Sequence, residues 1–136
     1  MGPLAKKYKK KYAYELARIA KGDLDSAKAL SAAKIGRPEN IVYHSQQCTE
    51  KLLKAVLCFY EKPIPHTHDL EALVAVLPEK VVPPDAFLLG TLSQYATIRK
   101  YEEGSEELSH EDFQNCILLA SRVLLWAEKI LGPEKP

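Results

Sequence analysis

Apolar residues recur at steps of three and four positions along nearly the whole chain, and glycine or proline interrupts this pattern at four places. Such spacing is typical of amphipathic helices, whereas the strict alternation of a half-buried strand is almost absent. The pattern predicts five helices, over residues from about 4 or 8 to 34, 38 to about 60, 70 to 77, 83 to about 104, and 109 to 131. Four long helices and one short helix, joined by brief loops, favour an all-α fold, an antiparallel helical bundle.

The length of 136 residues fits a single domain that covers residues 1–136 and buries a sizeable core. The formal net charge is only +1, but the charges are unevenly distributed. Residues 1–21 contain seven lysines and arginines against Glu15 alone, whereas residues 99–136 contain eight acids against five bases. We interpret the basic start as a solvated helix face, with the alternative that it orients an anionic ligand or a partner.

Two of the long helices show which side should face the core. In the first helix this side contains Tyr12, Leu16, Ile19, Ala27 and Leu30. In the fourth helix it contains Leu88, Leu92 and Tyr95. The fifth helix has the best start signal in the chain, because Ser109 can cap it and Asp112 occupies the capping-box position.

The three cysteines, Cys48, Cys58 and Cys116, lie in apolar helical segments and form no Cys-x-x-Cys pair. This placement favours buried free thiols in a reducing cytoplasm over a disulfide or a metal role. No apolar run approaches the length of a membrane-spanning helix, and the first residues lack the apolar core of a signal peptide. We therefore expect a cytoplasmic protein that does not contact a membrane.

Polar residues of different chemistry form a narrow strip along the second predicted helix. This polar strip consists of His44, Gln47, Glu50, Lys51 and Lys54. All but Glu50 fall within an arc of about 80°, beside a broad apolar surface that extends to Phe59 and Tyr60. Lysines one turn apart can hold phosphate oxygens, while His and Gln side chains can donate or accept hydrogen bonds. The strip predicts one of two roles. It contacts a ligand or nucleic acid, or it is structural. In the structural role, Glu50 and Lys54 form an i,i+4 pair and the strip forms a network with the fourth helix.

Two histidines mark the turn before the third helix, in the run His66-Thr67-His68-Asp69. Neighbouring residues in a turn rarely converge on a metal without a third ligand from elsewhere. We therefore expect Thr67 or Asp69 to cap the third helix and a histidine to orient the turn. No metal and no other cofactor are predicted.

The end of the fourth helix carries both signs of charge, over residues 99–103. Arg99 is favourable near a helix C-terminus, whereas Glu102 and Glu103 are not. The two acids therefore predict an ion-pair network with Lys51 or Lys54 across the bundle, or with the basic first helix of another subunit. The alternative is that Arg99 clamps an anionic ligand.

Tyrosines and lysines are interleaved near the N-terminus, where Tyr8, Tyr12 and Tyr14 lie within or just after the lysines of residues 6–11. Aromatic rings among lysines can bind nucleic acid by stacking and phosphate contact. On a helix, however, Tyr8 and Tyr12 share one face, which favours packing against the bundle or a second copy.

Motifs on three of the predicted helices together resemble one known family. They are Ala20-x-x-Asp23-Leu24-x-x-Ala27 on the first helix, Gln47-x-x-Glu50-Lys51-x-x-Lys54 on the second, and Pro65-x-x-His68-Asp69-Leu70-x-x-Leu73 at the start of the third. Over nearly the whole chain the combination resembles the HEPN domain (higher eukaryotes and prokaryotes nucleotide-binding). The resemblance implies a five-helix bundle, usually a homodimer, that is often encoded beside a minimal nucleotidyltransferase and is suspected of binding a nucleotide or a nucleic acid.

A large branch of that family consists of metal-independent RNases that act as toxins of toxin–antitoxin systems. They carry an Arg and, after four to six residues, a His, late in the chain at the dimer cleft. Here the late pair is Arg99 and His110, which are separated by ten residues. Arg37 and His44 have six residues between them but lie at the start of the second helix.

The sequence shows no Gly-rich phosphate loop, no Ser or Cys beside a base, and no paired-carboxylate signature of a hydrolase. These absences favour a non-catalytic module, and the family resemblance implies that it binds a nucleotide or another anion and pairs with a nucleotidyltransferase. An RNase toxin is the alternative, with Arg99 and His110 as its catalytic candidates. The expected ligand-binding residues are His44, Gln47, Glu50, Lys51, Lys54, His68 and Arg99.

Overall fold

The computed structural model describes residues 5–101 and 109–135, and the side-chain surroundings of residues 6–93 and 109–135. The described residues form five helices and two very short strands. The helices are α1 (Lys11–Ala33), α2 (Glu39–Phe59), α3 (Leu70–Ala75), α4 (Ala86–Tyr101) and α5 (His110–Leu131), and the strands are β1 (Ala5–Lys6) and β2 (Ile64–Pro65). The predicted all-α bundle of four long helices and one short helix is confirmed.

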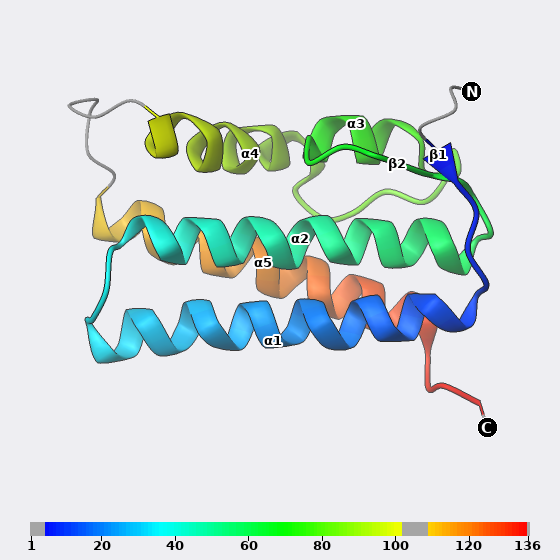
Figure 1. The fold of residues 1–136 in the computed structure, drawn as a ribbon, viewed down its shortest axis with the longest axis horizontal. Coiled ribbons are helices and arrows are strands. Elements are labelled where there is room, and N and C mark those ends of the chain that lie inside the picture. The colour runs from blue at the N-terminus through cyan, green and yellow to red at the C-terminus, as the bar shows by residue number, and fades with distance from the viewer. Residues whose placement is uncertain (1–4, 102–108, 136) are drawn as a thin grey trace.

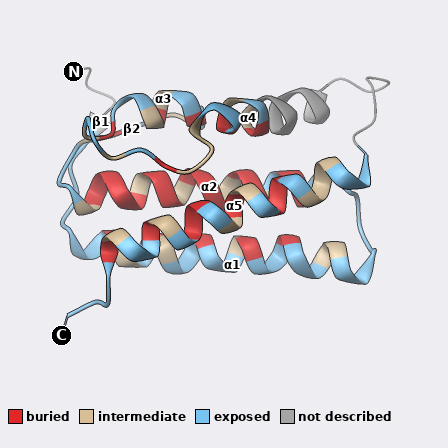
Figure 2. Ribbon diagram, turned by 180° about the vertical axis from the view of Figure 1, so that it is seen from behind, coloured by how far each residue is buried: buried red, intermediate tan, exposed pale blue. Residues whose placement is uncertain are grey.

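Helix α2 lies at the centre of the bundle and contacts each of the other four helices. Figure 1 shows α1 alongside α2 in the antiparallel direction, α5 crossing behind both, and α3 and α4 along the opposite side of α2. Thirteen residues of α2 are buried, and Figure 2 shows buried positions along most of its length. Buried polar groups are normally hydrogen-bonded, yet Ser45 Oγ and Gln46 Oε1 of α2 have no partner among the described residues.

Small side chains on α1 allow it to pack closely against the centre of the bundle. Ala13, Ala20 and Ala27 are spaced seven residues apart and are fully buried, together with Leu24. Seven residues are close to two helical turns, so these alanines form one line along the helix. Leu52 of α2 is fully buried as well, and burying such a side chain contributes about 1.5–3 kcal/mol.

The first helix begins later than predicted, at Lys11 rather than near residue 4 or 8. Residues 5 and 6 instead form β1, which pairs antiparallel with β2. Residues 6–11 contain five lysines, and like charges three or four positions apart destabilise a helix. An extended segment separates these charges, and pairing with β2 still provides partners for its backbone.

Four positions that were predicted to lie on apolar faces are partly exposed: Tyr12, Ile19, Tyr60 and Leu88. In α4, Leu89 is fully buried beside Leu92, whereas Leu88 is 37% exposed. In the described part of α4, the prediction is therefore confirmed for Leu92 and wrong for Leu88, whose neighbour Leu89 is buried instead. Helical spacing alone cannot separate the edge of an apolar stripe from its centre, because neighbouring elements decide what is covered. Tyr95 and Gly104, which were also assigned to this helix, lie outside the described side chains.

Predicted caps are confirmed at two helices. The Ser109 hydroxyl accepts a hydrogen bond from the Asp112 N–H (3.1 Å), and the Asp112 carboxylate accepts one from the Ser109 N–H (2.8 Å). At the start of α3, the Asp69 carboxylate accepts a hydrogen bond from the Glu71 N–H (3.0 Å). Helix α3 then ends at Ala75, two residues before the predicted end.

The three cysteines are free and buried, as predicted. Burial raises the pKa of the Cys48 and Cys116 thiols to about 12. Burial also raises the pKa of Cys58. In the described part of the chain, no helix combines the length and the hydrophobicity needed to cross a membrane.

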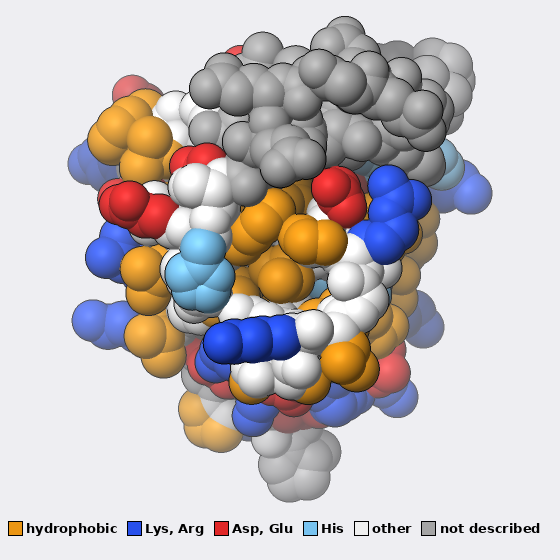
Figure 3. Space-filling model, turned by 90° about the vertical axis from the view of Figure 1, so that its left-hand side faces the viewer, with side chains coloured by type: hydrophobic (Ala, Val, Ile, Leu, Met, Phe, Trp, Pro, Cys, Tyr) orange, Lys and Arg blue, Asp and Glu red, His pale blue; other side chains and the backbone are white. Residues whose placement is uncertain are grey.

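One end of the bundle carries the α1–α2 connection and the start of α5. Figure 3 shows hydrophobic side chains gathered near the centre of this end, with basic, acidic and histidine side chains around them. Arg37 lies in the connection, and its Nε is 3.5 Å from the Glu39 carboxylate. The visible part of this end is thus of mixed charge rather than uniformly basic.

Candidate functional site

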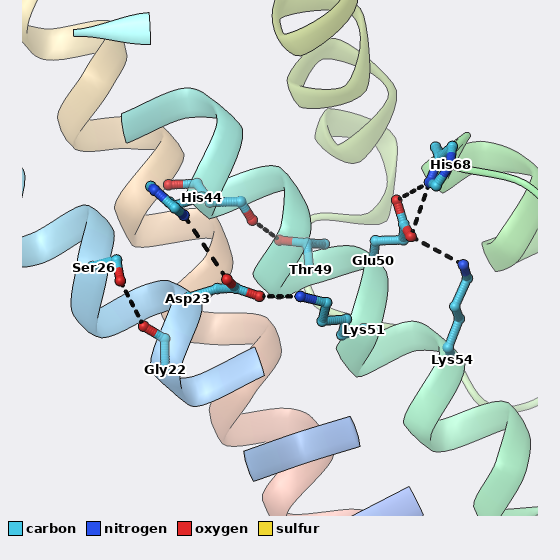
Figure 4. A network of polar contacts seen from close by, with 10 residues as sticks. Gly22, Asp23, Ser26, His44, Thr49, Glu50, Lys51, Lys54 and His68 are labelled. Carbon is cyan, nitrogen blue, oxygen red and sulfur yellow. Dashed lines mark hydrogen bonds and ion pairs between the residues drawn. The ribbon is translucent and has the colours of Figure 1, made fainter. Parts of the chain in front are cut away.

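The polar strip of α2 meets α1 through one carboxylate, that of Asp23. Lys51 Nζ lies 2.6 Å from Asp23 Oδ2, and His44 Nδ1 lies 3.8 Å from Asp23 Oδ1. Figure 4 shows Asp23 placed between these two side chains. His44 Nδ1 is buried and makes no hydrogen bond with any described residue, so Lys51 provides the close contact to this carboxylate. Asp23 therefore ties α1 to α2 through Lys51 and faces His44 at a longer distance.

Glu50 is the second carboxylate of this region and is only 3% exposed. Its two oxygens lie 3.0 and 3.1 Å from His68 Nδ1, and Lys54 Nζ donates to Oε2 at 3.0 Å. Figure 4 shows the carboxylate between His68 and Lys54. Gln46 Nε2 donates to the His68 carbonyl at 2.9 Å, which holds the turn at another point. A buried carboxylate is costly without such donors, so Glu50 fixes the turn before α3 against α2.

Of the two strip lysines, one has an unexpected carboxylate partner and the other has the predicted one. Lys51 pairs with Asp23 of α1, a partner that was not predicted. Lys54 forms the predicted i,i+4 pair with Glu50. The proposed acidic partners, Glu102 and Glu103, lie outside the described residues. Each lysine therefore already has a carboxylate within 3.0 Å, and the four charges sum to zero.

A pocket of about 320 Å³ opens beside these ion pairs. The segment before α1 and the first turns of α1 form one wall, and the turn between β2 and α3 forms another. Most of its polar and aromatic lining comes from Tyr8, Tyr12, Lys51, Lys54, His66 and His68. The volume lies at the lower end of the range for small-molecule sites, which begins at about 300 Å³.

The two tyrosines of the pocket are in ring contact with each other. The ring centroids of Tyr8 and Tyr12 are 5.0 Å apart and the planes are inclined by 33°. Both residues are between one third and two fifths exposed. The exposed part of either ring offers an apolar face on which another planar ring can stack.

The histidines of the turn provide polar groups on the opposite wall. The ring of His68 is 84% exposed although its Nδ1 faces Glu50, so Nε2 is the nitrogen that remains for another partner. His66 is also exposed. In the described part of the chain, no three His, Cys, Asp or Glu side chains are placed to hold a metal ion.

Other predicted site residues lie elsewhere. Gln47 is half-buried and does not line the pocket, and His44 faces Asp23. The Arg99 side chain lies outside those described, so its distance from His110 is not defined. His110 is the first residue of α5 and is exposed.

Sequence reasoning did not assign four residues to this region. Asp23 was not named as a site residue, although it belongs to the motif on the first helix. His66 was considered only for the turn. Tyr8 and Tyr12 were considered apart from the polar strip, because the pairing of β1 with β2 and the packing of α1 on α2 bring them beside it.

A second groove, of about 310 Å³, lies between α4 and α5. Its apolar lining includes Leu88 and Leu92 from α4 and Leu118 and Leu119 from α5. Leu118 is 49% exposed and Leu88 is 37% exposed. This groove therefore leaves apolar surface uncovered within one chain.

Known proteins share this architecture. The sequence model of the HEPN domain matches residues 13–130. The crystal structure of ST0689, an archaeal HEPN homologue, is similar with a TM-score of 0.70 and 25% identity, covering 88% of this chain and 98% of that one. The crystal structure of TT1696 from Thermus thermophilus has a TM-score of 0.74 and 20% identity, and the match covers 86% of this chain and 96% of that one. At this identity the similarity concerns the fold alone. No curated protein matches the sequence.

Proposed function

This chain belongs to the HEPN domain family, and from that premise we propose that it is a non-catalytic module that binds a nucleotide or a similar organic phosphate in the pocket beside α2. One observation carries the proposal: Lys54, His66 and the Tyr8–Tyr12 pair line the same pocket of about 320 Å³. Ammonium and imidazole groups suit a phosphate, and the tyrosine rings suit a nucleobase.

The ion pairs leave the lysines able to contact a ligand. A lysine ammonium has three donors, and Lys54 uses one of them on Glu50. The remaining N–H groups of Lys54 can donate to phosphate oxygens. Lys51, which donates to Asp23, likewise has N–H groups left for a phosphate. Glu50 repels an anion and is buried, so its role in this proposal is to position Lys54 and His68.

Calorimetric titration of the full chain with nucleoside mono- and triphosphates tests the proposal. His66→Ala and Tyr8→Ala alter exposed side chains of the pocket, and we expect each to weaken binding at least fivefold. Tyr43→Ala is the matched control, because Tyr43 is exposed and does not line the pocket; its affinity should equal that of the unaltered chain. Absence of binding by every nucleotide contradicts the proposal.

The proposed protein partner is a minimal nucleotidyltransferase. Neither described strand carries an aspartate, whereas such transferases place spaced aspartates on a strand. Nucleotidyl transfer would then be performed by the other chain. Co-expression with the product of a neighbouring nucleotidyltransferase gene should give a complex that survives purification, and two separate proteins would contradict this pairing.

We also propose a homodimer, supported by the uncovered apolar groove between α4 and α5. Leu118→Glu places a charge in that groove and should convert the dimer to a monomer in light scattering. Ile35→Glu is the control, since Ile35 is 64% exposed and lies outside the groove. A monomeric unaltered chain contradicts the proposal.

The RNase alternative makes a different prediction. It requires that purified protein cleaves RNA without metal and that Arg99→Ala or His110→Ala abolishes the cleavage. Intact RNA after incubation with the unaltered protein removes this alternative and leaves the binding module.

A further inference from the structure

Residues 6–12, which run from β1 into the first turn of α1, are held against the C-terminal half of α2 and are called the N-terminal strap below. Its start pairs with β2, with Lys6 opposite Ile64. The Cys58 thiol donates to the Lys9 carbonyl at 3.1 Å, and Lys10 Nζ lies 4.1 Å from the centroid of the Phe59 ring. These contacts place a lysine-rich segment along the rim of the pocket that Tyr8 and Tyr12 line.

The strap supplies positive charge that the pocket lacks. Lys51 and Lys54 are balanced by Asp23 and Glu50. In contrast, the five strap lysines form no ion pair with any carboxylate of the described residues, and all five are exposed. An anion that reaches beyond the pocket therefore meets unbalanced positive charge on the strap.

The size of the pocket limits what can enter it. A volume of about 320 Å³ suits one nucleotide unit, since sites for larger ligands extend toward 1,000 Å³. A base that stacks on the Tyr8–Tyr12 pair must be unpaired, because the faces of paired bases are covered by their neighbours in a duplex. The strap lysines outside the pocket would then lie beside the phosphates of the neighbouring nucleotides in the same strand.

We infer that the pocket and the strap form one continuous site for a single-stranded nucleic acid, with one nucleotide in the pocket and the flanking phosphates on the strap lysines. The inference rests on the proposed nucleotide site and assigns its ligand class. Base stacking on tyrosine tolerates any base, so this site selects single strands rather than a sequence.

Fluorescence anisotropy with the full chain tests this inference. The probes are an octauridylate RNA, an octathymidylate DNA, an eight-base-pair duplex and, in competition, uridine monophosphate. We expect at least one single strand to bind ten times more tightly than the monophosphate and the duplex. The RNA and DNA arms show which sugar the site accepts.

The triple variant K7A/K9A/K11A isolates the contribution of the strap. We expect it to weaken octamer binding at least tenfold and to leave the monophosphate unaffected. The slope of log affinity against log salt should fall by about 2, because each phosphate contact on a single strand contributes about 0.7. The control variant K28A/K80A/K129A removes the same charge from exposed positions elsewhere, and its affinity for the octamer should fall much less. The variant K7R/K9R/K11R keeps the charge and should retain octamer binding.

The outcomes separate this inference from the proposed function. If the monophosphate binds but no octamer binds more tightly, or if the duplex binds as well as the single strands, the inference is wrong and the nucleotide site stands. Equal losses in the two triple alanine variants also overturn it, since they indicate a general charge effect. If neither monophosphate nor octamer binds, both proposals fail.

Discussion

The Nδ1 atom of His68 lies 3.0 and 3.1 Å from the two carboxylate oxygens of Glu50, so a residue of the turn before α3 is attached to a buried acid of the central helix. Lys54 provides the other donor to this carboxylate. The relationship explains how a turn whose histidines are exposed can form a defined wall of the pocket. It also makes Glu50 dependent on both partners, since a buried carboxylate is stable only when compensated.

Removal of Lys54 is expected to destabilise the fold. Lys54→Met keeps much of the side-chain volume but leaves Glu50 with His68 alone, and we expect the free energy of unfolding to fall by about 1–3 kcal/mol. Urea denaturation measures the change. Lys62→Met, at an exposed position, should change stability by less than about 0.5 kcal/mol. Equal stability of the two variants contradicts the structural role of this ion pair.

A neutral residue at position 23 is expected to loosen the contact between α1 and α2. Asp23→Asn removes the charge that pairs with Lys51 and faces His44, and we expect a loss of about 1–3 kcal/mol. Asp25→Asn is the matched control, because it makes the same change two residues away at an exposed position. Thermal unfolding compares the two, and a larger effect at position 25 would contradict the geometry described.

Loss of the N-terminal cap of α5 should lower the free energy of unfolding by less than loss of either ion pair. Ser109→Ala removes the hydroxyl that accepts from the Asp112 N–H, and we expect a loss of about 1 kcal/mol. Ser26→Ala provides the comparison, since Ser26 lies within α1 and only donates to the Gly22 carbonyl of its own helix. Alanine is a better helix former than serine, so that variant should be unchanged or slightly more stable.

The buried cysteines predict a loss of stability at high pH. The pKa of Cys48 and Cys116 is raised by burial from 9.0 to about 12. Below about pH 9 the thiols are protonated in both the folded and the unfolded chain, and their contribution is fully present. Between pH 9 and about 12 only the unfolded chain loses these protons, so the free energy of unfolding falls by about 1.4 kcal/mol per pH unit for each thiol.

Chemical denaturation across this pH range measures the slope. The variant C48A/C116A titrates all other groups in the same way and should show a shallower decline, although its absolute stability is lower. The same shift predicts that iodoacetamide modifies neither thiol at pH 8 until the chain unfolds. Parallel slopes for the two proteins contradict the assigned burial.

Much of the fold was predictable because it depends on residues close together in the chain. The spacing of apolar side chains defined the helices, and the caps at Asp69 and Ser109 were readable from a few neighbouring residues. Where the prediction was wrong, distant segments intervened. The first helix begins at Lys11 because the preceding residues pair with β2, and Leu88 is exposed because other elements cover Leu89 instead.

The candidate site divides in the same way. Helical spacing brought Lys51 and Lys54 together on one strip of α2, and the motifs indicated the family. The partner of Lys51 lies 28 residues away on α1, and neither its identity nor the pocket beside it follows from spacing along one helix. The roles of the predicted ligand-binding residues stay predictions until a ligand is measured.

By itself, the sequence determined where helices form and which residues of α2 carry polar groups, because hydrogen bonding and apolar periodicity within a helix are local. Only the tertiary structure decided that Tyr8, Lys54 and His66 line one pocket. Their meeting requires β1, α2 and the turn before α3 to pack together, and that packing is set by contacts between segments far apart in the chain. A site made from several elements therefore depends on the way the helices cover one another.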